Sequence, residues 1–222
     1  ITVGKEALAI SSTPRYFMNS VIIAGCSTLL ALIFGTLSAY AFSRFEVPGK
    51  SDILFFILSQ KFLPPVVVII PIFMMYRFLG WIDSYKGMIL LYTSFNLPFV
   101  VWMVKGFMDD IPVDYEEAAL VDGYTRFQAF FRITLPQALP GLAATAVFCL
   151  ITVWNEYVFS AILTGDRAKT APVAIASSIG TQMTDWGIVA ALTTIFVIPV
   201  IIFTLLVRNY LLRGVTFGVI RR

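Results

Sequence analysis

The chain has 222 residues, of which 59% are hydrophobic and only 13% are charged, and its mean hydropathy is +0.86. This composition excludes an ordinary soluble globular domain and predicts an all-α, polytopic helical membrane protein. The formal net charge of +3 is spread between apolar blocks and forms no basic stripe, so nucleic acid is not an expected partner. Histidine is absent, and Cys26 and Cys149 lie in apolar runs, so we expect free thiols and no metal site.

Five apolar segments are long enough to cross a bilayer, which takes about 20 residues per helix. In chain order they cover about 17–42, 53–79, 87–104, 139–163 and 188–210. Each is expected to be helical, because a backbone in lipid needs its hydrogen-bond partners within the segment. Pro64-Pro65 and Pro71 are expected to break the second segment, and Pro199 to kink the fifth.

Lysine and arginine between the segments predict the orientation. With a cytoplasmic C-terminus, nine basic residues lie on the cytoplasmic side and six on the other. Five spans then place residue 1 outside, although no signal segment would carry it there, so we expect a sixth span N-terminal to residue 1. The chain is thus predicted to be a single transmembrane domain, 1–222, with a cytoplasmic loop at about 105–138 and an external loop at about 164–186.

The predicted cytoplasmic loop begins with a short acidic helix. Pro112 suits the first turn of that helix, and the acidic side chains that follow favour its positive N-terminal end. Ala118 and Ala119 keep the helix thin, and Gly123 is expected to stop it.

A second short helix is expected after Gly123. Thr125 and Gln128 fit a capping box, and the next apolar side chains have helical spacing: Phe127, Phe130 and Phe131. Pro136 and Pro140 are expected to turn the chain back into the bilayer. An amphipathic helix on the lipid surface is the alternative, but six acids against three bases suit an anionic leaflet poorly. The pattern therefore favours docking to a protein partner.

From Glu117 to Gly123 the chain reads E-A-A-x-x-D-G, and Ile133-x-Leu135-Pro136 follows. This string resembles the EAA loop of ABC importer permeases. Tyr124 departs from the pattern, since a small residue often follows the Asp-Gly pair. Further stretches resemble the carbohydrate-uptake branch of the family, in particular the maltose-type second permease subunit: Asn19-Ser20, Ala39-Tyr40-Ala41 with Arg44, Ile70-Pro71, Pro98-Phe99 with Trp102, Ile111-Pro112, Trp154-Asn155-Glu156 and 214–218.

The resemblance implies a type I importer permease with six spans in the bacterial cytoplasmic membrane. It implies a second permease subunit, expected to form a heterodimer with this one, two cytoplasmic ATPase subunits, an external solute-binding protein and a sugar or polyol as substrate. ATP and Mg would be bound by the ATPase subunits, because this chain has no G-x-x-x-x-G-K-[ST] loop, so no catalytic residue or cofactor is expected here. The residues implied to couple to the ATPase are Glu116, Glu117, Ala118, Ala119, Asp122, Gly123 and Arg126.

Polar side chains inside the spans are candidates for the solute path, because they are costly in lipid and usually face the bundle interior. The candidates are Gln60, Tyr92, Asn96, Trp154, Asn155 and Glu156. The alternative is that they bond neighbouring helices, for about 1 kcal/mol or less each.

Three further alternatives concern the external loop, the C-terminal tail and the function itself. The external loop 164–186 is either a flexible loop that contacts the binding protein or a plain solvated connector. The tail 214–222 either reaches between the ATPase subunits or is a basic frayed end. An ion-coupled secondary sugar transporter is the alternative function, although the chain shows no duplicated pattern of spans.

Overall fold

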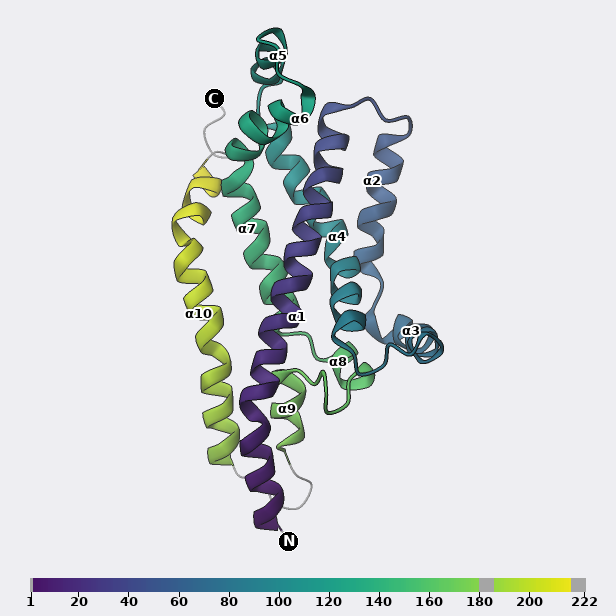
Figure 1. Cartoon of the computed structure of the whole chain (residues 1–222), viewed down its shortest axis with the longest axis vertical. Coiled ribbons are helices and arrows are strands. Elements are labelled where there is room, and N and C mark those ends of the chain that lie inside the picture. Colours follow the sequence, from purple (N-terminus) through teal and green to yellow (C-terminus); the bar gives the residue numbers. More distant parts are fainter. Residues whose placement is uncertain (1, 180–185, 217–222) are drawn as a thin grey trace. The chain divides into compact units, whose positions relative to one another are not determined.

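A computed structural model of the chain describes residues 2–179 and 186–216, with side chains described for 12–179 and 186–205. The described residues form helices and no strand (Figure 1), which confirms the all-α prediction. The elements are α1 (Thr2–Arg44), α2 (Lys50–Ser59), the 3₁₀ turn η1 (Gln60–Phe62), α3 (Pro65–Leu79), α4 (Tyr85–Asp109), α5 (Asp114–Val121), α6 (Arg126–Ala129), the π turn η2 (Phe130–Thr134), α7 (Leu135–Trp154), α8 (Val158–Leu163), α9 (Ala171–Ser177) and α10 (Trp186–Thr216).

Four helical stretches of the described chain are long and apolar enough to cross a membrane: Ser12–Arg44, Tyr85–Asp109, Arg126–Trp154 and Trp186–Leu205. A fifth span exists if the pair Lys50–Phe62 and Pro65–Leu79, bent by 92°, counts as one. The bend lies where Pro64-Pro65 predicted a break. Pro65 starts α3 and restricts Pro64 to an extended conformation, ψ 132°, which no α-helix accommodates.

The fourth span differs from the predicted range 139–163. It begins at Arg126, because α6, η2 and α7 are continuous, and Pro136 and Pro140 do not turn the chain as predicted. The Leu135 N–H bonds the Phe130 carbonyl five residues back, so a widened turn directly precedes Pro136. The extra residue gives room for a proline ring that would otherwise meet the preceding turn.

The same span ends at Trp154, nine residues earlier than predicted, and α8 is a separate short helix. The Glu156 carboxylate accepts the N–H groups of Phe159 at 2.9 Å and Ser160 at 3.3 Å. Both N–H groups belong to the first turn of α8, where an α-helix supplies no acceptors of its own, so the carboxylate favours a helix start here over a continuous span.

The chain divides into two compact units, with boundaries inside α1, α4, α7 and α10 and between η1 and α3. The first unit contains residues 1–28, 63–93 and 150–204, and the second contains 29–62, 94–149 and 205–222. The tail 217–222 and the loop residues 180–185 lie outside the described residues, and so do the side chains of 206–216. The predicted role of the tail 214–222 falls mostly on these residues.

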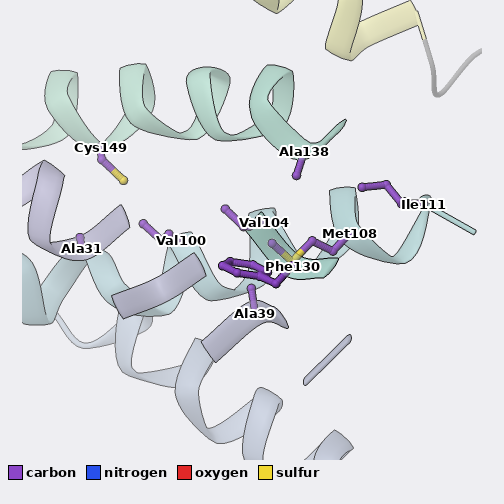
Figure 2. Packing of buried hydrophobic residues seen from close by; sticks show 9 residues of the cluster. All are labelled: Ala31, Ala39, Val100, Val104, Met108, Ile111, Phe130, Ala138 and Cys149. Atoms are coloured by element: carbon purple, nitrogen blue, oxygen red, sulfur yellow. The ribbon is translucent and has the colours of Figure 1, made fainter. Parts of the chain in front are cut away.

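The core of the second unit joins α1, α4, η2 and α7. Figure 2 shows its side chains directed toward one another: Ala31, Ala39, Val100, Val104, Met108, Ile111, Phe130, Ala138 and Cys149. Glycines permit the close approach of these helices. A methyl group on Gly35 would collide with Val100, and one on Gly141 would collide with the Phe107 ring.

We predict that Gly141→Ala lowers the free energy of unfolding by about 1–3 kcal/mol, because the added methyl group displaces the half-buried Phe107 ring that packs against Gly141. Thermal unfolding of the purified chain in detergent measures the effect. Gly25→Ala is the matched control, since a methyl group there meets nothing within 4 Å, and the substitution should stabilise helix α1 slightly. Equal melting temperatures for the two variants would contradict the packing argument.

Candidate functional site

Helix α5 is short, acidic and sharply terminated. Gly123, with φ +90°, donates its N–H to the Leu120 carbonyl at 3.1 Å, and the Tyr124 N–H reaches the Ala119 carbonyl at 2.9 Å. These two bonds form a Schellman motif and confirm Gly123 as the stop. Pro112 lies just before the helix, which begins at Asp114, so its predicted place in the first turn is wrong by two residues.

Helix α6 begins with the predicted capping box. The Thr125 N–H donates to the Gln128 side chain at 2.9 Å, and the Gln128 N–H donates to the Thr125 hydroxyl at 3.3 Å. The three phenylalanines of the predicted apolar face contact one another: the ring centroids of Phe127 and Phe131 lie 4.7 Å apart, and those of Phe130 and Phe131 lie 4.8 Å apart. Phe130 is buried with 3% of its surface exposed, whereas Phe127 is 68% exposed and Phe131 is also exposed. The three rings therefore form one apolar face, of which the chain itself covers only the part at Phe130.

The side chain of Glu116 is buried inside the second unit, with 5% of the residue exposed. Its Oε1 atom accepts hydrogen bonds from Arg44 Nε at 2.6 Å and from Thr134 Oγ1 at 2.5 Å. Its Oε2 atom accepts one from the Tyr40 hydroxyl at 2.9 Å. Three donors from α1 and η2 therefore meet one carboxylate of α5. We call these four residues the Glu116 cluster.

Two opposing effects act on the charge of Glu116. Burial raises the pKa of the carboxyl, whereas the hydrogen bonds from Thr134, Arg44 and Tyr40 and the charge of Arg44 lower it, and the pKa ends below its usual value. The carboxylate is thus ionised at neutral pH, and the cluster is a charge-assisted network rather than a set of neutral contacts.

The other residues implied to couple to an ATPase divide by exposure. Glu117, Ala118, Asp122, Gly123 and Arg126 are exposed, while Ala119 and Glu116 are buried within the chain. The exposed surface also carries Phe127, which the sequence pattern predicted as apolar, and two apolar side chains that sequence reasoning missed: Tyr115 and Val121, which is 88% exposed. Their position in a polar segment was the available signal. An apolar side chain in a water-facing loop is poorly solvated, so a group of them indicates an interaction surface.

In the first unit, Asp83 holds the start of the predicted external loop. Its carboxylate accepts the N–H groups of Gly165 at 2.8 Å, Arg167 at 3.1 Å and Ala168 at 2.8 Å, while its own N–H bonds the Leu163 carbonyl. Asp83 has φ +53°, an uncommon conformation for a residue other than glycine. Burial raises the pKa of its carboxyl, but the three N–H groups outweigh that effect and lower it.

Helix α1 binds the same loop. The Asn19 amide donates to the carbonyls of Arg167 at 3.1 Å and Lys169 at 2.8 Å, and the Ser20 hydroxyl accepts the Ala171 N–H at 2.8 Å. Residues 165–171 are therefore tied down along their backbone, and α9 follows directly. The interpretation of 164–186 as a flexible loop is wrong for this part, because Asp83 and two side chains of α1 hold its backbone. The sequence did not show this, since those residues lie far away along the chain.

The solute-path candidates of the first unit have defined partners. The Tyr92 hydroxyl donates to Glu156 Oε2 at 2.5 Å, and the buried Trp154 ring stacks on Phe196 and donates its N–H to the Phe196 carbonyl at 3.2 Å. Asn155 is exposed, and its amide bonds the Ile151 carbonyl of its own helix at 2.8 Å. Trp154 therefore joins two helices, whereas this bond of Asn155 joins none.

Gln60 and Asn96 belong to the second unit. The Gln60 amide reaches the Phe56 carbonyl of the preceding turn at 3.4 Å, and the neighbouring Lys61 ammonium donates to the Phe95 carbonyl at 3.1 Å. Asn96 is 2% exposed, and its Nδ2 atom has no hydrogen-bond partner among the described residues. A buried amide without a partner is costly, which is typical of a functional position rather than a stabilising one.

Residues 29–217 match the model of the family described as binding-protein-dependent transport system inner membrane component. The chain belongs to this family. The permease is 35% identical to the trehalose/maltose transport system permease protein of Thermococcus litoralis, over 94% of the chain and 76% of that protein. It is also 35% identical to the trehalose transport system permease protein of Mycobacterium tuberculosis, over 92% and 76% respectively.

Solved structures share the fold of the permease. A bacterial ABC transporter involved in the import of alginate matches with a TM-score of 0.74 and 24% identity, over 88% of this chain and 74% of that one. The MetNI methionine ABC transporter in an inward-facing conformation matches with a TM-score of 0.72 and 19% identity, over 90% and 97%. The permease is thus a multi-pass inner-membrane component with the fold of ABC importer permeases.

We predict that Asp83→Asn lowers the free energy of unfolding by about 1–2 kcal/mol at pH 7, because charge-assisted hydrogen bonds to the loop become neutral. The folded pKa of Asp83 lies below its unfolded value of about 3.9, so this stabilisation is present above that pH and is lost as the pH falls through the folded pKa. Melting temperatures of both proteins between pH 7 and pH 3 should converge toward the acid end.

Asp166→Asn is the control for this prediction. Asp166 lies on the same loop, is exposed, and forms a surface ion pair with Lys169 at 3.3 Å, which contributes little to stability. A difference between wild type and Asp83→Asn that stays constant from pH 7 to pH 3 would contradict the assigned role of the charge.

Proposed function

We propose that the permease is the membrane-spanning subunit of an ATP-driven importer for a sugar or polyol, driven by a separate ATPase that docks on α5. The names of two relatives that cover more than 90% of this chain support the solute class, since they are trehalose/maltose and trehalose permeases. The observation that carries the coupling role is the exposed, acidic face of α5, with Glu117 beside the small Ala118 and a Gly123 turn held by its own backbone bonds.

The coupling contact combines an ion pair with close approach of the two backbones. Glu117 offers an exposed carboxylate to a basic residue of the ATPase, and Ala118 lets the partner surface approach the α5 backbone. Val121 and Phe127 add apolar area around this charge, which suits an interface with an apolar centre and a polar rim. The C-terminus lies on the same, cytoplasmic side in this proposal, and ATP and Mg are bound by two copies of the ATPase subunit.

Further partners complete the transporter. A second permease subunit, expected to be a different chain, forms the other wall of the path, and an external binding protein delivers the solute. A solved relative of the fold supports such a partner, since the alginate ABC transporter is known in complex with a pentasaccharide-bound periplasmic protein. Residues 165–171, fixed by Asp83 and Asn19, give the external face of this permease a preformed surface.

The solute path uses polar side chains that do not bond a neighbouring helix. Asn155 is exposed and bonds its own helix, and Asn96 keeps an amide without a partner, so both have hydrogen-bonding capacity for hydroxyl groups. Gln60 lies beside the Pro64 break, where the backbone is not helical. Tyr92 instead binds Glu156, and Trp154 binds Phe196 of α10, so these three side chains join segments of the wall. The comparisons give no support to an ion-coupled secondary transporter.

We predict that Glu117→Lys abolishes stable binding of the ATPase subunit and reduces uptake at least tenfold, because a charge reversal in a docking surface adds repulsion. Co-purification of the ATPase with the tagged permease measures the effect. Glu46→Lys, the same reversal at an exposed position outside α5, should retain binding. Normal co-purification and uptake with Glu117→Lys would overturn the proposed docking site.

Asn155→Ala should leave membrane insertion and ATPase binding intact, because its amide bonds only its own helix among the contacts that the structure gives. We expect a changed ratio of radiolabelled trehalose to maltose uptake, or a changed basal ATPase rate in proteoliposomes. If the variant fails to assemble with its partners, Asn155 holds subunits together, and the path assignment is wrong.

A further inference from the structure

Helix α5 is connected by the chain to two long helices but not to the third one beside it. Residues 110–113 link it to α4, and residues 122–125 link it to α6, which continues through η2 into α7. Helix α1 ends 70 residues earlier in the sequence, at Arg44. Any movement of α5 therefore acts directly on α4 and α7, and acts on α1 only through side-chain contacts.

Those contacts are concentrated in the Glu116 cluster. Arg44 and Tyr40, both on the last turns of α1, bind the two oxygens of the Glu116 carboxylate. The Arg44 guanidinium also donates from Nη2 to the Ile111 carbonyl at 3.0 Å, in the link between α4 and α5. One turn of α1 thus forms hydrogen bonds both to the start of α5 and to the segment that leads into it.

A second set of contacts joins the end of α1 to the end of α4. The Ser43 hydroxyl donates to Asp109 Oδ1 at 2.7 Å and accepts from Arg44 Nη1 at 3.1 Å, while Lys105 pairs with the other oxygen of Asp109. On the opposite side, Thr134 connects the carboxylate to η2, and its side chain is fully buried. The cluster therefore contacts α1, α5 and the helix that leads into α7 at one point.

The ion pair at this point is buried. The side chains of Arg44 and Glu116 are only 4% and 7% exposed, so both charges depend on each other and on their hydrogen bonds. A buried ion pair is a weak source of net stability compared with apolar packing, but it fixes the mutual position of its two partners, because separating them leaves unpaired charges away from water. A fixed distance between these two residues is what α1 needs if it is to follow a movement of α5.

We propose that Glu116 is a positioning residue that makes the end of α1 move together with α5 when the ATPase subunits close on nucleotide. This inference rests on the proposed function, in which α5 receives the movement. Glu117 on the exposed face receives the force, and Glu116 on the buried face transmits it to a helix that the chain does not connect to α5. Adjacent acidic residues of one helix thus serve opposite faces and different steps.

The distance between α1 and α5 tests the proposal. Spin labels are attached at Leu37→Cys, exposed on α1, and Asp114→Cys, exposed at the start of α5, in a chain with Cys26→Ser and Cys149→Ala. The complete complex with its ATPase subunits is measured by pulsed electron resonance without nucleotide and after trapping with ATP and vanadate. We expect the same distance distribution in both states of the otherwise unaltered chain.

In Glu116→Gln we expect the distribution to shift or broaden on trapping, and the ratio of solute transported to ATP hydrolysed to fall about tenfold, a typical size for a coupling effect between sites. Asp52→Asn is the matched control, an exposed acid in the first turn of another helix, and should behave like the unaltered chain. The exchanged pair Arg44→Glu with Glu116→Arg should restore part of the fixed distance, since the ion pair is re-formed in reverse.

The outcomes separate this proposal from the proposed function. If ATPase subunits fail to co-purify with the labelled, otherwise unaltered chain, and also with the unlabelled wild type, the docking proposal fails. If they bind and Glu116→Gln keeps the same distance in both states, the positioning role is wrong. Should Glu116→Gln not fold, Thr134→Val and Arg44→Lys each weaken the cluster while keeping the ion pair, and a distance unchanged on trapping in both would equally overturn the proposal.

Discussion

Three carboxylates hold this chain where its helices stop, and the rest of the architecture depends on them. The N–H groups at a helix start, and those of a connecting loop, have no partner within their own element. Glu156 binds two such groups at α8, Asp83 binds three in the loop 165–168, and Glu116 gathers three side-chain donors at α5. These three connections thus each have a specific polar anchor.

Much of the fold could be predicted because it depends on local patterns. Apolar length predicted most of the spans, and turn chemistry predicted the Gly123 stop and the capping box of Thr125 and Gln128. The errors arose where hydrogen-bond register overrode local rules. A π turn before Pro136 let the helix continue through that proline, and a carboxylate two residues after Trp154 ended the span early. Neither effect has a short sequence signature.

The candidate site was predictable in its exposed half only. The pattern around Glu117 marks an outward acidic helix, and the structure exposes that side chain. Glu116 shares its chemistry and neighbourhood, so the sequence could not show that it is buried, because its partners Arg44 and Thr134 lie 72 and 18 residues away. Asp83 was missed for the same reason. Long-range partners of a single carboxylate leave no periodic trace.

The α5–α6 connection satisfies its own backbone before any other molecule arrives. Its turn is closed by Gly123 and Tyr124, and the next helix is capped by Thr125 and Gln128. A surface with that much internal order loses little conformational entropy when it is covered, so association should be fast and only weakly dependent on refolding of the loop. In the proposed coupling role, such a contact is tight enough to transmit movement and is still released within each transport cycle.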